Sequence, residues 1–304
     1  MKTKSAVLLG FALAAAFAAL ALVSICTGSS GVSAREILRA LFCGSPDESV
    51  NLLLWQIRMP RLCAAVLTGA SLSLAGAGMQ TLFRNPLADP SITGVSSGAA
   101  LVCAIGRIDS RLSALSTLLG GIAVNAFCGA IVGFFMYTVR DAGMRGFVFW
   151  SLGSLDRCGW YEIAASYAMS IPAWIYIFAS ARKLNVLLLG EENAYHCGVD
   201  VERVRIGVIA AAAVMTAASV SICGVIGFVG LVVPHVLRMA AGPDNRALLP
   251  MSALGGASLV IFADVVSRSF SNTDPIPIGV VTALIGAPFF AVLLRTKGGG
   301  GAGA

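Results

Sequence analysis

The residues able to perform acid–base, nucleophilic or metal chemistry are few in this sequence. It has two histidines, His196 and His235, and neither belongs to an HExxH pair. No GxxxxGK[ST] segment is present, so nothing in the chain could cradle the phosphates of ATP. His235 follows Pro234 within an apolar run, where we expect a packed or interface histidine rather than a catalytic one. We therefore predict no catalytic residue, no metal site and no bound cofactor in the chain itself.

One acidic residue lies near the end of an apolar run. Asp264 precedes Arg268 by four residues, a spacing that places both side chains on one face of a helix. Two interpretations follow from this pair. It could simply be an ion pair at the end of a helix. Alternatively, it could be a polar element beside a translocation path, because ionisable groups at membrane depth are often functional.

The composition indicates that the solvent around most of the chain is lipid. Of the 304 residues, 57% are apolar and 12% are charged, and the mean hydropathy is +0.86. Soluble domains carry roughly 25% charged residues, so this chain has too few charged residues to cover the surface of a soluble protein. The net charge is +6, but the Lys and Arg residues are scattered between apolar runs. That distribution favours basic loop ends over a nucleic-acid surface, and we predict no nucleic-acid partner.

Nine apolar runs predict an all-α fold, a polytopic transmembrane helical bundle. They lie at residues 6–23, 62–83, 92–106, 113–139, 160–181, 206–223, 225–241, 250–266 and 278–294. We treat residues 1–297 as one transmembrane domain, and we read its first run as a retained helix rather than a signal peptide. Residues 298–304 contain only Gly and Ala and are predicted to be a disordered tail. The eight cysteines form no CxxC pair and are expected to be free thiols.

The segments between the runs carry most of the charged and turn-forming residues. Residues 84–90 contain two prolines, an Asn and an Asp, which predicts a rigid turn. Residues 184–200 form a polar loop in which a short surface helix fits between Gly190 and Gly198. Such a helix could be merely solvated structure, or it could dock a soluble partner. Residues 27–57 are too polar for hydrocarbon and are predicted to lie outside the membrane.

Taken in order, several short motifs resemble the permease subunits of ATP-binding-cassette importers for iron-siderophores, haem and cobalamin, known as the FecCD family. No single motif is decisive, but together they extend over about residues 56–290. They are Gln56-Ile57-Arg58-Met59-Pro60-Arg61, Gly76-Ala77-Gly78-Met79-Gln80, Asn85-Pro86-Leu87-Ala88-Asp89-Pro90, Gly94-Val95-Ser96-Ser97-Gly98, Trp150-Ser151-Leu152-Gly153-Ser154, Leu189-Gly190-Glu191, Gly227-Phe228-Val229-Gly230-Leu231-Val232-Val233-Pro234-His235, Pro277-Ile278-Gly279-Val280-Val281-Thr282 and Gly286-Ala287-Pro288-Phe289.

The resemblance implies a division of labour among several chains. This chain would form the translocation path together with a second permease copy, either identical or a close paralogue. Two ATPase subunits would bind ATP and Mg on the cytoplasmic side. An extracytoplasmic binding protein would deliver an iron-siderophore, haem or cobalamin. The expected location is the bacterial inner membrane, which the chain would cross many times.

The resemblance also implies one docking surface on each side of the membrane. Arg58, Arg61 and Arg268 match arginines that pair with glutamates of the binding protein. Without the family, each would be read as a side chain that extends from a helix end to the interface. The inner surface, where the ATPase couples, corresponds to Gly190, Glu191, Glu192, Ala194 and Gly198. A polar gate would correspond to Ser116 and Thr117.

One interval departs from the family pattern. The family usually has ten crossings, but the interval between Gly94 and Trp150 has room for only two runs, so the fourth helix is predicted to be missing. Basic residues near both ends of the chain favour a cytoplasmic position for both, which requires an even number of crossings. We therefore expect the irregularity to fall within residues 92–145.

Two other functions are weighed against the importer permease. An ion-gradient-driven secondary transporter would need ionisable groups in broken helices near mid-membrane, and the centres of the runs hold almost none. An intramembrane enzyme is disfavoured by the shortage of catalytic residues. Stimulation of a partner ATPase would distinguish the permease from both alternatives.

Overall fold

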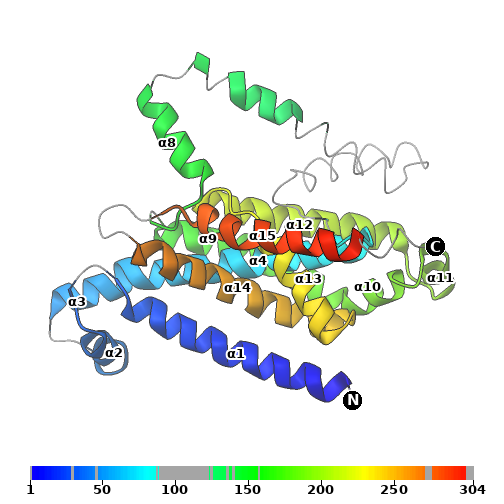
Figure 1. Cartoon of the computed structure of the whole chain (residues 1–304), viewed down its shortest axis with the longest axis horizontal. Helices are drawn as coiled ribbons and strands as arrows, with labels where there is room; N and C mark the ends of the chain where they lie inside the picture. The colour runs from blue at the N-terminus through cyan, green and yellow to red at the C-terminus, as the bar shows by residue number, and fades with distance from the viewer. Residues whose placement is uncertain are drawn as a thin grey trace.

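All regular structure in the described part of the chain is helical (Figure 1). The computed structural model describes residues 2–28, 31–44, 47–86, 88, 123, 126–134, 137–138, 141–156, 158–270 and 276–298. No residue in these ranges lies in a β-strand. The prediction of an all-α, polytopic helical bundle is confirmed.

In chain order, the helices are α1 (Lys2–Cys26), α2 (Ala34–Cys43), α3 (Glu48–Leu52), η1 (Leu53–Arg58), α4 (Met59–Leu82), α8 (Asp141–Ser151), α9 (Trp160–Ala179), α10 (Ala181–Leu187), α11 (Glu191–His196), α12 (Val201–Cys223), α13 (Val229–Ala241), α14 (Asn245–Ser269) and α15 (Ile278–Gly298). Their lengths range from five residues in α3 to 25 residues in α1 and α14.

One continuous helix of 35 residues runs through α3, η1 and α4. Asp47 caps its start by accepting a hydrogen bond from the Ser49 backbone N–H at 2.9 Å. The π-helical turn η1 ends at Arg58, two residues before Pro60, whose ring removes a backbone donor. Its other end is closed by Arg84, which takes a left-handed conformation with φ 47°. The predicted turn at 84–90 begins there, and residues 87, 89 and 90 lie outside the described residues.

Most predicted runs coincide with helices. The runs are 6–23, 62–83, 160–181, 206–223, 225–241, 250–266 and 278–294. In the same order, the matching helices are α1, α4, α9, α12, α13, α14 and α15. Among the described residues, four helices are long and apolar enough to cross a membrane, or five if α9 and α10 form one span bent by 53°. The run at 92–106 and most of 113–139 lie outside the described residues, and so does much of the interval expected to lack a helix. Gly298 ends α15, and the remainder of the predicted tail also lies outside.

The run at 225–241 is helical only from Val229, where α13 begins. Phe228 takes a left-handed backbone conformation with φ 69°, which a helix cannot contain. Residues 224–227 are non-helical and pack on another loop, where the Ser154 N–H donates to the Cys223 carbonyl at 2.8 Å. The result is a helix of 13 residues, about 20 Å long at 1.5 Å per residue.

The continuous helix lies at the centre of the bundle, and glycines bring its backbone against two neighbours. A methyl group at Gly69 would overlap the backbone of Gly256 in α14. One at Gly76 would overlap the backbone of Gly230 in α13. Small residues permit such close approach, which matters in lipid because apolar surface gains little there by leaving the solvent.

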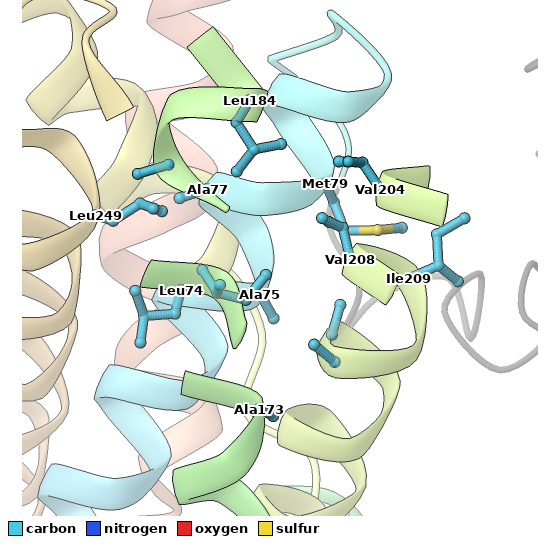
Figure 2. Close-up of a cluster of buried hydrophobic side chains, with 14 of the residues drawn as sticks. Leu74, Ala75, Ala77, Met79, Ala173, Leu184, Val204, Val208, Ile209 and Leu249 are labelled. Atoms are coloured by element: carbon cyan, nitrogen blue, oxygen red, sulfur yellow. The ribbon is translucent and has the colours of Figure 1, made fainter. Parts of the chain in front are cut away.

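An apolar cluster packs α4 against α9, α10, α12 and α14. Figure 2 shows Leu74, Ala75 and Met79 of α4 facing side chains from α9, α10 and α12. Met79 and Val208 are both fully buried in this cluster. The apolar side chains fix the distance between these helices.

The two ends of the bundle are formed by different segments (Figure 1). The start of α1, the α10–α11 segment and the last turns of α15 lie at one end, which we call the α11 end. The segments α2 and α3 lie at the other, which we call the α3 end. Placement of the Lys2 region, residues 182–183 and the end of α15 on one side agrees with the distribution of basic residues.

The glycine contacts of α4 generate a stability prediction. Gly76→Ala should destabilise the folded chain by about 3 kcal/mol or more, because backbone rather than a flexible side chain must move. Thermal unfolding in detergent, followed by size-exclusion chromatography, measures the effect. Gly10→Ala in α1 is the matched control, since nothing lies within 4 Å of its added methyl group. Equal stability of the two variants would show that the α4–α13 contact is not tight.

Candidate functional site

A buried carboxylate organises the α3 end of the bundle. Asp264, near the end of α14, is only 1% exposed. It accepts a hydrogen bond from Arg61 Nε at 2.7 Å and forms an ion pair with Arg268 Nη2 at 2.8 Å. The predicted pair between Asp264 and Arg268 is confirmed. The other partner of Asp264, Arg61, lies at the start of α4, so a single carboxylate ties two helices together.

The same arginines extend the network to two other segments. Arg61 Nη1 also pairs with Asp156, whose side chain is 41% exposed in the loop before α9. Arg268 donates to the carbonyl of Thr27 at 2.9 Å and to Ser24 Oγ at 3.1 Å, both at the end of α1. Arg58 donates to the Ile25 carbonyl in the same region. We call Arg58, Arg61, Arg268, Asp156 and Asp264 the arginine cluster.

The three arginines predicted to dock a binding protein therefore lie together at one end. Their side chains are largely buried and bound to groups of this chain, so none extends alone into the interface. The cluster contains three guanidinium groups and two carboxylates, so it carries one excess positive charge. Sequence reasoning found the arginines but missed Asp156, because nothing local links it to a residue 95 positions earlier.

The predicted ATPase-coupling loop lies at the opposite end. The short helix expected between Gly190 and Gly198 is confirmed as α11. Both glycines have positive φ values, 120° and 76°, which side chains rarely tolerate. Ala194 is fully buried and anchors the loop, whereas Glu192 is exposed. Glu191 pairs with Arg205 of α12 at 2.6 Å.

A second polar cluster lies beside this loop and was missed by sequence reasoning. Asn185 of α10 contacts Asp244 and Asn245 at the start of α14. Asn245 in turn contacts Thr81 near the end of α4. We call these four residues, together with Arg238 of α13, the amide cluster. Asn and Thr carry no strong local signal, so only the tertiary structure brings them to notice.

Two other predictions concern chemistry. Cys26, Cys43, Cys63, Cys128, Cys158, Cys197 and Cys223 are free thiols. Within the described ranges, no three His, Cys, Asp or Glu side chains are grouped so that they could hold a metal ion. Ser116 and Thr117, the predicted gate, lie outside the described residues.

The family motifs meet in pairs across the structure. Gln80, in the motif at 76–80, donates to the carbonyls of Gly230 at 3.2 Å and Leu231 at 3.0 Å, in the motif at 227–235. The N–H groups of Ile278 and Gly279 donate to the carbonyls of Gly153 and Leu152, at 2.9 and 3.0 Å. Motifs far apart in sequence are therefore direct structural neighbours.

Comparison with known proteins covers nearly the whole chain. The model of the FecCD transport family matches residues 15–108 and 100–296. The hemin transport system permease protein HmuU of Yersinia pestis is 37% identical over 314 residues, which covers 91% of this chain and 94% of that protein. The cobalamin import system permease protein BtuC of Halobacterium salinarum is 40% identical over 280 residues, covering 82% and 75%.

One solved structure has a similar fold over nearly the whole chain. It is an inward-facing conformation of a metal-chelate type ABC transporter, with a TM-score of 0.82 and 30% sequence identity. The alignment covers 94% of this chain and 98% of the solved one. The paired motifs, the helical bundle and the extent of these matches lead to one conclusion: the chain belongs to the FecCD transport family.

Proposed function

We propose that the chain is the permease subunit of an ATP-binding-cassette importer that takes up an iron-siderophore, haem or cobalamin. The observation that carries this proposal is the near full-length match to permeases named for hemin and cobalamin import. An extracytoplasmic binding protein delivers the substrate, and a second permease copy completes the path. Two ATPase subunits bind ATP and Mg, and the assembly lies in the bacterial inner membrane.

The arginine cluster supports a docking role for the α3 end. Its excess positive charge favours an acidic partner, and the partly exposed Asp156 marks where Arg61 meets solvent. Charge complementarity of this kind mainly accelerates and orients association. We propose that Arg58, Arg61 and Arg268 supply this charge to the binding protein.

The α11 end supports a role in holding the ATPase. Gly190 and Gly198 permit the turns at the two ends of the short helix, and the buried Ala194 packs it against the bundle, which leaves its other face exposed to a partner. Glu191 and Glu192 give the first turn of α11 negative charge, which stabilises the helix through its dipole. We propose that this face contacts the ATPase subunit.

A secondary transporter is the alternative, and the break between α12 and α13 bears on it. Secondary transporters bind their coupling ion at broken helices near mid-membrane, through backbone carbonyls and helix ends. Here residues 224–228 are Gly, Val, Ile, Gly and Phe, none of which is ionisable. Without a side-chain charge to stabilise such an ion, the break favours the ATP-driven importer.

Transport in proteoliposomes tests the proposal. With ATP and the ATPase inside and the binding protein outside, we expect uptake of haemin, a ferric siderophore or cobalamin that persists when proton and sodium ionophores are added. Uptake that needs no ATP and stops with an ionophore would instead identify a secondary transporter.

Docking at the arginine cluster predicts a salt-dependent association rate. Arg268→Gln should slow binding-protein association several-fold at low salt, and the difference should shrink as salt screens the charge. This arginine is chosen because Asp264 keeps Arg61 as a partner when it is lost. Arg203→Gln is the control, since it removes the same charge from an exposed site at the start of α12. Surface plasmon resonance measures both rates, and equal rates would exclude the arginine cluster as the docking charge.

A cytoplasmic position for α11 predicts one-sided labelling. A cysteine at Asn193, in a background without native cysteines, should react with an impermeant maleimide in inverted vesicles and remain unreacted in intact cells. Asn193 is suitable because it is exposed. Rapid labelling from outside intact cells would contradict the proposed orientation.

A further inference from the structure

The amide cluster is built around the side chain of Asn185. Its Nδ2 donates to Asp244 Oδ1 at 2.6 Å. Its Oδ1 accepts from the backbone N–H of Asn245 at 2.7 Å and from Asn245 Nδ2 at 2.9 Å. One side chain of α10 therefore holds the first residue of α14 and the residue that caps it.

The cluster continues into two more helices. Asn245 Oδ1 lies 3.0 Å from Thr81 Oγ1, whose single proton is shared between Asn245 and the Ala77 carbonyl at 2.9 Å. Arg238 Nη2 donates to the same Thr81 oxygen at 3.0 Å. Asn245 and Thr81 are both fully buried, so an unmade hydrogen bond here costs roughly 1–3 kcal/mol. A connected chain of hydrogen bonds thus joins α10, α14, α4 and α13.

The position of the cluster gives it significance for transport. Asn185 lies six residues before Glu191, the first residue of α11. Around it α10 packs through Leu184 and Leu187, whose apolar contacts are not directional. Directional hydrogen bonds resist sliding between helices, whereas apolar contacts allow it.

We propose that Asn185 is the positioning residue that transmits movement of the α10–α11 segment to α4, α13 and α14. The inference rests on the proposed function, in which α11 contacts the ATPase. When ATP binding displaces α11, the hydrogen bonds of Asn185 carry that displacement into the start of α14 and the end of α4. Without them, α10 slides along its apolar contacts, and the ATPase cycles without moving the path.

The charge of Asp244 makes this proposal testable by exchange. Arg246 donates hydrogen bonds to Asp244, as does Asn185, and they hold the pKa of Asp244 well below its usual range. Asp244 is therefore ionised near neutral pH and acts only as an acceptor. A second carboxylate at position 185 would repel it at hydrogen-bond distance.

The experiment uses Asn185→Asp, Asp244→Asn and the double variant in the complete transporter. Asn185→Asp removes the donor, so we expect the stimulation of ATP hydrolysis by the loaded binding protein to fall about tenfold, within the range of coupling effects. Basal hydrolysis and co-purification of the ATPase should stay unchanged. Asp244→Asn keeps an acceptor and a cap, and should resemble the wild type.

The double variant supplies the decisive comparison. An amide at 244 can keep its oxygen on the capping N–H of Arg246 and donate from its nitrogen to a carboxylate at 185, which reverses the direction of the hydrogen bond and keeps the net charge of the wild type. Stimulation should therefore recover. A purely structural role would change stability and basal hydrolysis together, and would not lower the stimulated-to-basal ratio alone.

Each other result has a defined meaning. Normal stimulation in Asn185→Asp, or no recovery in the double variant when Asp244→Asn is normal, overturns the inference. If Asn185→Asp does not fold, Asn185→Ala replaces it, and a wild-type ratio there likewise overturns the inference. Failure of the ATPase to bind even the wild-type chain would instead overturn the proposed function.

Discussion

The backbone contacts of α4 are the constraint on which the rest of the structure depends. At Gly69 and Gly76 this helix touches α14 and α13 with no room for a side chain. In lipid, apolar surface gains little from burial between helices, so close packing and internal hydrogen bonds must hold the bundle together. The glycines satisfy the first requirement. They also fix where the ends of α4 lie, and polar clusters occur at both of those ends.

The two polar clusters have the same construction and opposite positions. In the arginine cluster, Asp264 joins α14 to α4 through Arg61, and its other partner, Arg268 of α14, reaches the end of α1. In the amide cluster, Asn185 and Asn245 join α10 to α14 and α4. A buried charge or amide must keep its partners, so each cluster resists local rearrangement. Both ends of the bundle are therefore held by polar contacts, whereas apolar side chains and close backbone contacts pack the helices between them.

The sequence predicted features that have local causes. Apolar run length predicted the helices, four-residue spacing predicted the pair of Asp264 with Arg268, and two glycines around charged residues predicted α11. It could not predict features that depend on distant segments. Arg61 and Asp264 are 203 positions apart, and nothing in either neighbourhood specifies the other. Phe228 gave no signal that it would adopt a left-handed conformation and delay the start of α13. The amide cluster was invisible for a similar reason, because Asn and Thr are common at helix ends and acquire a role only from their neighbours.

The central claim is that the two ends of the bundle serve different partners on opposite sides of the membrane. Binding to sealed vesicles of known orientation tests it most directly, because each partner then meets one end only. The account predicts that purified ATPase subunits bind inverted vesicles alone and that the binding protein binds right-side-out vesicles alone. Binding of both proteins to vesicles of the same orientation would contradict it.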